Sequence, residues 1–184
     1  MHWRAFLSNL KERGIHGLRI ITSDDHQGLK AALRTAFNGV PWQRCQVHLQ
    51  RNATAYVTKM YKRDTVAQDI RTIFNAPDRQ EAERLLDKMV DKYNKEMPKL
   101  ASWMQTNISE GLTVLALPVH LRSRLRTTNM VERLNREIKR RTKVASIFPN
   151  EAALLRLVGS LLMETSEEWE SGKKYLNLES ELTQ

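Results

Sequence analysis

Asp24 and Asp25 lie in the segment Ser23-Asp24-Asp25-His26, which follows a short β-branched run, Leu18–Thr22, typical of a buried strand. Ligand-binding groups gather at the C-terminal ends of strands in α/β units. A carboxylate there can ligate Mg²⁺ or Mn²⁺, which prefer oxygen. A second interpretation fits the same residues, because serine and aspartate are good N-caps for the helix that follows.

Cys45 and His48 form a C-x-x-H pair. Thiolate and imidazole bind zinc, so the pair could be half of a zinc site. No second cysteine exists, and the remaining histidines are His2, His16, His26 and His120. The competing interpretation, which the single cysteine favours, is a structural Cys–His contact at a strand-to-helix junction.

Glu132 lies among arginines near the start of a predicted helix that covers Asn129–Lys143. A carboxylate in this position could be a metal ligand beside a DNA backbone. The alternative is a capping box, because Asn129 precedes Glu132 by three residues.

Basic residues are concentrated around this third segment. The chain has 184 residues and a formal net charge of +9, and residues 121–143 hold nine basic side chains against two acidic ones. Such a patch attracts polyphosphate, because each neutralised phosphate releases condensed counterions. A solvated helix face is the alternative for the same charges.

The N-terminal part of the chain is predicted to form a βαβ unit. A helix over Trp3–Arg13 is expected to stop at Gly14, and the strand Leu18–Thr22 leads into an amphipathic helix over Leu29–Phe37. A second strand is expected within Val40–Val47. Strand, helix and strand within about 30 residues predict parallel pairing with a right-handed crossover.

From residue 48 onward the patterns become helical. We expect helices over 48–62, 65–75, 78–97 and 99–106. This run predicts an all-helical insertion over residues 50–110. After the helix over Asn129–Lys143, a last long helix is predicted to begin with Asn150 as its N-cap.

Composition excludes two classes of protein. One cysteine rules out an internal disulfide framework and indicates a reducing cytoplasm. No run approaches the roughly 18 apolar residues that a membrane span needs. A disulfide-stapled secreted protein and a membrane protein are therefore both excluded by these patterns.

Five motifs, in order, resemble the catalytic region of mutator-type transposases of bacterial insertion sequences. They are SDDHQGL, WQRCQVHLQRN, TTNMVERLNREIKRRTKV, IFPNEAALLRLVGSLLMETSEEW and KKYL. The resemblance extends from about Phe6 to Leu176 and implies a helix-dominated α/β fold. In that family the core is RNase H-like, which here would comprise residues 1–49 and 111–184, with the all-helical insertion at 50–110.

The resemblance also implies a site. Asp24 corresponds to the second catalytic aspartate and Glu132 to the catalytic glutamate, which together with a first aspartate would bind two Mg²⁺ or Mn²⁺ ions. Cys45 and His48 correspond to a pair that supports the active site. The implied reaction is DNA cleavage at element ends followed by strand transfer, in a DNA complex and in a possible homo-oligomer. The basic residues expected along the DNA backbone are Arg126, Arg133, Arg136, Lys139, Arg140, Arg141 and Lys143.

The first aspartate of the family triad has no counterpart, because Glu12 is the one acidic residue before Asp24. We therefore expect the C-terminal part of a transposase, truncated and inactive alone. Two alternatives remain open: a non-catalytic nucleic-acid-binding remnant, and a helical interaction module in which the basic segment meets the acidic tail of another copy.

Overall fold

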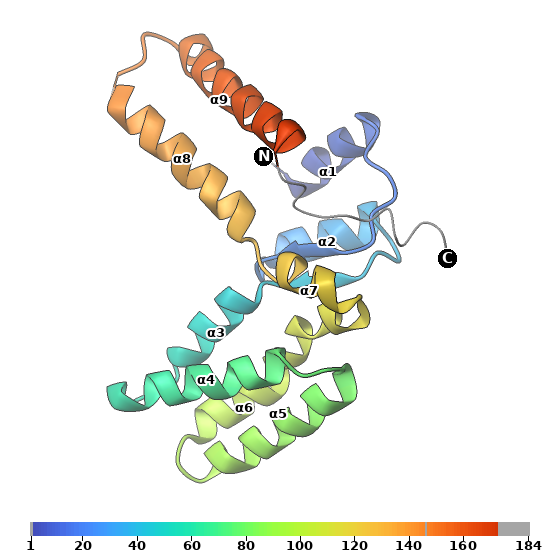
Figure 1. Cartoon of the computed structure of the whole chain (residues 1–184), viewed down its shortest axis with the longest axis vertical. Helices are drawn as coiled ribbons and strands as arrows, with labels where there is room; N and C mark the ends of the chain where they lie inside the picture. Colours follow the sequence, from blue (N-terminus) through green and yellow to red (C-terminus); the bar gives the residue numbers. More distant parts are fainter. Residues whose placement is uncertain (1, 146, 173–184) are drawn as a thin grey trace. The chain divides into compact units, whose positions relative to one another are not determined.

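The computed structural model describes residues 2–145 and 147–172. It divides into two compact units, with the boundary between Thr128 and Asn129. Helices dominate both units, and the described strands form one small sheet in the first (Figure 1). The KKYL motif at residues 173–176 lies outside the described residues.

The first unit begins with the predicted βαβ arrangement. Helix α1 spans Trp3–Glu12, strand β1 Ile21–Ser23, helix α2 Gln27–Ala36 and strand β2 Trp42–Arg44. The strands pair in parallel, with Ile21 opposite Trp42 and Ser23 opposite Arg44, as predicted. On the helices, Leu7, Ala32 and Leu33 form a small buried cluster.

Both strands are shorter than predicted. β2 begins after Pro41, which has no N–H to donate to a ladder, and it ends where Cys45 becomes the N-cap of the next helix. Because β2 offers three residues, β1 pairs over three residues only. Leu18 therefore lies outside the strand that was expected to begin there.

Residues 50–110, all of which are described, contain helices and no strand, as predicted. The elements are α3 (Gln46–Thr54), the 3-10 turn η1 (Met60–Lys62), α4 (Arg63–Phe74), α5 (Arg79–Asn94) and α6 (Pro98–Asn107). The single helix expected over 48–62 is wrong. Its α-helical part ends at Thr54, and the N–H groups of the next three residues donate to carbonyls three positions earlier, as in a tighter turn.

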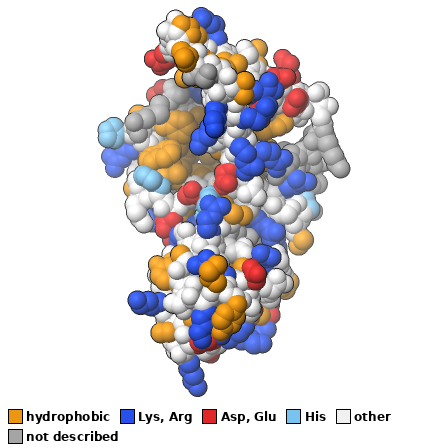
Figure 2. All heavy atoms as spheres, turned by 90° about the vertical axis from the view of Figure 1, so that its left-hand side faces the viewer, with side chains coloured by type: hydrophobic (Ala, Val, Ile, Leu, Met, Phe, Trp, Pro, Cys, Tyr) orange, Lys and Arg blue, Asp and Glu red, His pale blue; other side chains and the backbone are white. Residues whose placement is uncertain are grey.

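The main hydrophobic core lies among these helices. Its fully buried side chains include Leu49, Ile70, Ile73, Leu100 and Met104. The surface of this part, the lower region in Figure 2, shows apolar side chains between Lys and Arg side chains. Met60 and Tyr61 are among the exposed apolar residues.

Two buried glutamines join the sheet to the chain that follows α6. The Gln43 amide nitrogen donates to the Gly111 carbonyl at 2.8 Å, and its Oε1 accepts from the Val114 N–H at 2.8 Å. Gln46 donates to the same Gly111 carbonyl. These bonds hold the 3-10 turns η2 (Ile108–Gly111) and η3 (Thr113–Ala116) against β2 and α3.

Helix α7 (Val119–Leu125) completes the first unit. The α/β segment and the helical segment therefore lie in one compact unit. The division into a core at 1–49 and 111–184 and an insertion at 50–110 stays a prediction.

The second unit is a helical hairpin of α8 (Asn129–Ala145) and α9 (Glu151–Ser171). The Asn150 side chain accepts from the Ala153 N–H at 2.9 Å, which confirms the predicted N-cap. α8 begins at Asn129 itself, so a capping box with Asn129 as the preceding cap is wrong. None of the described helices is long and apolar enough to span a bilayer.

Candidate functional site

The helix after β1 is capped by His26, whose Nδ1 accepts from the Leu29 N–H at 3.2 Å. The proposal that Ser23, Asp24 or Asp25 caps this helix is therefore wrong. Ser23 instead accepts a hydrogen bond at 2.9 Å from the Trp42 indole N–H of the neighbouring strand. The side chains of Asp24 and Asp25 are thus available for other interactions, and the two aspartates have different partners.

Asp25 belongs to a network of two cations and two carboxylates. Arg44, whose side chain is 4% exposed, contacts Asp25 at 3.2 Å and Glu110 at 2.9 Å. Lys30 contacts the same two carboxylates at 3.2 and 2.8 Å, and its ammonium group lies 4.4 Å from the centre of the Trp42 ring. Charge is balanced within this network, which gives Asp25 a structural role.

Asp24 faces a different cluster, with Cys45 and His48. Its carboxylate is 58% exposed, and its Oδ1 contacts Nδ1 of His48. The Cys45 thiol is fully buried and accepts a hydrogen bond at 3.4 Å from the Thr128 hydroxyl. One ligand atom from each of Asp24, Cys45 and His48 lies within 4.8 Å of the other two.

The backbone around this cluster is held from two sides. The Cys45 N–H donates to the Ser23 carbonyl at 2.8 Å, which extends the sheet register by one residue. The Gln46 N–H donates to the Arg126 carbonyl at 3.0 Å, and the Thr22 hydroxyl donates to the Leu125 carbonyl. The predicted strand-to-helix junction is therefore present, with Cys45 as N-cap of α3 and His48 in its first turn.

The seven basic residues predicted to bind DNA are in different environments. Arg126, in the first unit, donates to the Asn75 side chain at 2.8 Å. Arg140 and Arg141 both donate hydrogen bonds to Glu137. These bonds lower the pKa of Glu137 to about 2, and the bond from Arg140 contributes most. Glu137 therefore stays ionised at neutral pH and partly neutralises both arginines.

Four of the seven remain, and Arg136, Lys139 and Lys143 form one group among them. All three are exposed, and within the described part of the chain none has an ion pair. At about 100° per residue, these three and Glu132 fall within an arc of roughly 60° on α8. Glu132 thus shares a helix face with the three basic side chains.

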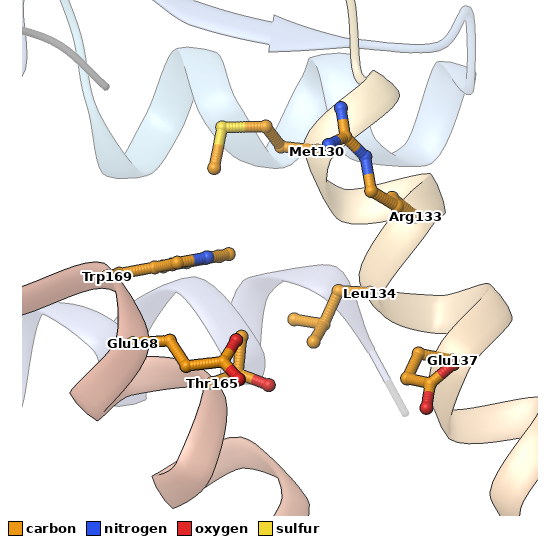
Figure 3. A pocket seen from close by; sticks show the side chains of 7 residues that line it. All are labelled: Met130, Arg133, Leu134, Glu137, Thr165, Glu168 and Trp169. Atoms are coloured by element: carbon orange, nitrogen blue, oxygen red, sulfur yellow. The ribbon is translucent and has the colours of Figure 1, made fainter. Parts of the chain in front are cut away.

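The other side of α8 contacts α9. A pocket of about 430 Å³ lies between the two helices, and Met130 and Leu134 point toward Trp169 (Figure 3). Arg133, the seventh predicted DNA contact, lines this pocket. The apolar positions at helical spacing in both segments indicate that each helix has an apolar face, but they do not predict this pocket.

Comparisons with known proteins identify the class to which this fold and these residues belong. A family model described as "Transposase, Mutator family" matches residues 1–172. The chain therefore belongs to the Mutator family of transposases, as the motifs predicted.

Similar proteins come from several bacteria. The chain is 56% identical to the transposase for insertion sequence element IS406 of Burkholderia multivorans, over 96% of this chain and 46% of the relative. It is 40% identical to the transposase for ISRM5 of Rhizobium meliloti, over 96% of this chain and 44% of the relative. For the transposase of IS256 in Tn4001 of Staphylococcus aureus the identity is 36%, with coverages of 96% and 46%. The chain thus spans about half the length of the curated relatives it matches.

Proposed function

We propose that this chain is part of the catalytic region of a DNA transposase, with Asp24 and Glu132 as two metal-binding carboxylates of an RNase H-like site. The observation that carries this proposal is the difference between the two adjacent aspartates. Asp25 is engaged by Arg44 and Lys30, whereas Asp24 is exposed at the end of β1 and caps no helix. The family membership and the parallel β1–β2 pair support the same assignment.

The exposed carboxylate of Asp24 suits Mg²⁺ or Mn²⁺, because these hard cations prefer oxygen ligands. Two bound cations would activate the attacking oxygen and stabilise the leaving oxygen at phosphorus. The chain itself positions Asp24, because the backbone hydrogen bond between Cys45 and Ser23 fixes the end of β1. On α8, Arg136, Lys139 and Lys143 would hold a DNA backbone along the face that carries Glu132, by phosphate contacts without base readout.

By itself the chain supplies two of the three expected carboxylates. Glu12, the one acidic residue before Asp24, is exposed on α1 and is absent from the cluster that contains Asp24. We therefore propose that this chain alone does not cleave DNA. We further propose that the protein acts on DNA in the cytoplasm and that it does so as an oligomer of identical chains.

A manganese titration tests whether Asp24 and Glu132 share a site. We expect Asp24→Asn and Glu132→Gln each to weaken Mn²⁺ binding at least about tenfold, since even residues that only orient a metal ligand contribute about 10- to 100-fold. The double variant should be little weaker than either single variant, because a shared site is lost once. Electron paramagnetic resonance of free Mn²⁺ measures the affinity.

Two exposed carboxylates serve as controls for this titration. Asp64→Asn on α4 and Glu164→Gln on α9 should bind Mn²⁺ like the parent protein. Independent, additive losses from Asp24→Asn and Glu132→Gln would show two separate sites and would contradict the proposal.

DNA binding should depend steeply on salt. We expect Arg136→Ala/Lys139→Ala/Lys143→Ala to reduce the slope of log K against log salt by about three units, at roughly 0.9 per lost phosphate contact. Glu137→Gln should steepen the slope, because it releases Arg140 and Arg141 from their ion pairs. Fluorescence anisotropy of a labelled duplex over a salt series measures these slopes.

The matched control for the triple variant is Lys88→Ala/Lys95→Ala/Lys99→Ala, which removes three exposed lysines from α5, its C-terminus and α6. Its slope should stay at the parent value. Equal slopes for the two triple variants would mean that the Glu132 face of α8 does not contact DNA.

A further inference from the structure

The cluster at the end of β1 contains more than the proposed transposase chemistry requires. Mg²⁺ and Mn²⁺ prefer oxygen ligands, yet Asp24 shares its site with a thiol and an imidazole. Sulfur and nitrogen ligands suit a borderline-soft ion instead. The spacing of Cys45 and His48 favours a structural contact over half of a zinc site when only cysteine and histidine count as further ligands. In the folded chain Asp24 supplies a third ligand atom, which the sequence spacing does not reveal.

We propose that Asp24, Cys45 and His48 form a binding site for a thiophilic divalent cation, of which Zn²⁺ is the physiological example. Each of the three residues supplies one ligand atom, and these atoms lie within 4.8 Å of one another. In a tetrahedral zinc site, bond lengths of about 2.0–2.3 Å place the ligand atoms about 3.5 Å apart. Binding therefore requires rotations of these side chains that bring the three ligand atoms to this spacing.

The charge and the surroundings of the site suit such an ion. The Asp24 carboxylate and a Cys45 thiolate together balance a charge of +2, and His48 ligates as neutral imidazole. Three protein ligands and one water complete four-coordination, the pattern of zinc sites that keep an open position. The 58% exposure of Asp24 gives ions an entry path to the buried thiol.

The ligands are also held in place before any ion binds. Cys45 is fixed through its backbone bond to Ser23, and His48 lies one turn further along α3. Thr128 donates to the Cys45 sulfur and orients it. This site belongs to the first unit and does not depend on Glu132 or on DNA cleavage.

The site has a regulatory consequence that rests on the proposed function. A zinc ion at Asp24 occupies a carboxylate that the transposase reaction needs for Mg²⁺ or Mn²⁺. Zn²⁺ should therefore compete with Mn²⁺ for the protein, and this competition should require Cys45 and His48.

Cobalt spectroscopy of the metal-free chain tests the proposal. Because Cys45 is the single cysteine of the chain, a thiolate-to-Co²⁺ charge-transfer band in the near ultraviolet can arise only there. We expect one Co²⁺ per chain with this band and with intense visible bands of tetrahedral cobalt. Zn²⁺ should displace Co²⁺, since it binds such sites more tightly, and millimolar Mg²⁺ should not.

Variants distinguish this site from adventitious thiol binding. Cys45→Ser should remove the charge-transfer band, while His48→Gln and Asp24→Asn should each weaken Co²⁺ binding at least about tenfold. His16→Ala, which changes an exposed histidine outside the cluster, should behave like the parent. Circular dichroism identifies any variant that fails to fold, and Cys45→Ala and His48→Ala are the second choices.

The result that would overturn the proposal is a parent protein without the charge-transfer band. The proposal would also be overturned if folded His48→Gln and folded Asp24→Asn both showed the band and bound Co²⁺ as tightly as the parent, because Cys45 would then bind cobalt alone. If the cobalt site is present and Mn²⁺ does not bind, the cation site stands and the shared Asp24–Glu132 site fails.

Discussion

Replacing Arg44 by alanine is expected to destabilise the first unit by about 3–5 kcal/mol, the range for breaking a buried ion pair from one side. Arg44 is nearly fully buried between Asp25 and Glu110 and also donates to the Asn107 side chain at 2.9 Å. Its loss leaves Lys30 as the one cation beside two carboxylates and opens a space behind β2. Urea denaturation followed by circular dichroism measures the change in the free energy of unfolding.

The matched control is Arg84→Ala on α5, which removes an exposed guanidinium paired with Glu81 one turn away. This variant should unfold near the parent midpoint, because exposed pairs are screened by solvent. Combining Arg44→Met with Glu110→Gln should destabilise less than the sum of the two single changes, since Lys30 then pairs with one remaining carboxylate, Asp25, and the charges balance again. An Arg44→Ala protein as stable as the Arg84→Ala protein would contradict the assigned role of the network.

The sequence predicted those parts of the fold that depend on local patterns. The parallel βαβ unit follows from the β-branched run Leu18–Thr22, an amphipathic helix and a second short strand segment soon after that helix. The absence of strands in residues 50–110 follows from helical periodicity. The Asn150 cap is equally local, because it depends on a residue three positions away. Such features need no information about distant parts of the chain.

The interactions that decide between Asp24 and Asp25 could not be predicted in this way. Arg44 contacts Glu110, which lies 66 positions away in the sequence, and the Cys45 sulfur contacts Thr128, which lies 83 positions away. No periodicity connects such residues. The cap at His26 was missed for another reason: an imidazole nitrogen can accept from a backbone N–H, yet histidine is not among the preferred N-caps.

The basic segment shows the same limit. Its charge was visible in the sequence, but the pairing of Arg140 and Arg141 with Glu137 and the position of Arg133 at the α8–α9 pocket depend on helix geometry. Seven predicted contacts therefore reduce to three candidates on one face. That face includes Glu132, which the sequence identified through resemblance alone.

The second large effect is expected in transposition itself. The 177 residues of this chain that align with the IS406 transposase can replace the matching region of that relative, which is 56% identical over this length and about twice as long as this chain. In this chimera, Asp24→Asn and Glu132→Gln should each reduce transposition to the level of cells without transposase. Asparagine and glutamine keep the shape of each side chain but cannot offset the charge of a bound divalent cation.

The controls for the chimera are again Asp64→Asn and Glu164→Gln, which remove exposed carboxylates from α4 and α9. Immunoblotting confirms equal amounts of every protein, so that a loss of activity is not a loss of stability. Asp25→Asn should reduce transposition only in proportion to its effect on protein abundance, because Asp25 acts through Arg44 and Lys30.

The most direct measurement of the central claim is the transposition frequency of this chimera with and without its two proposed metal-binding carboxylates. We predict transposition by the parent chimera and by both control variants, and none by Asp24→Asn or Glu132→Gln. Transposition at the parent frequency by either of these two variants, present at parental abundance, would contradict the assignment of Asp24 and Glu132 as catalytic carboxylates.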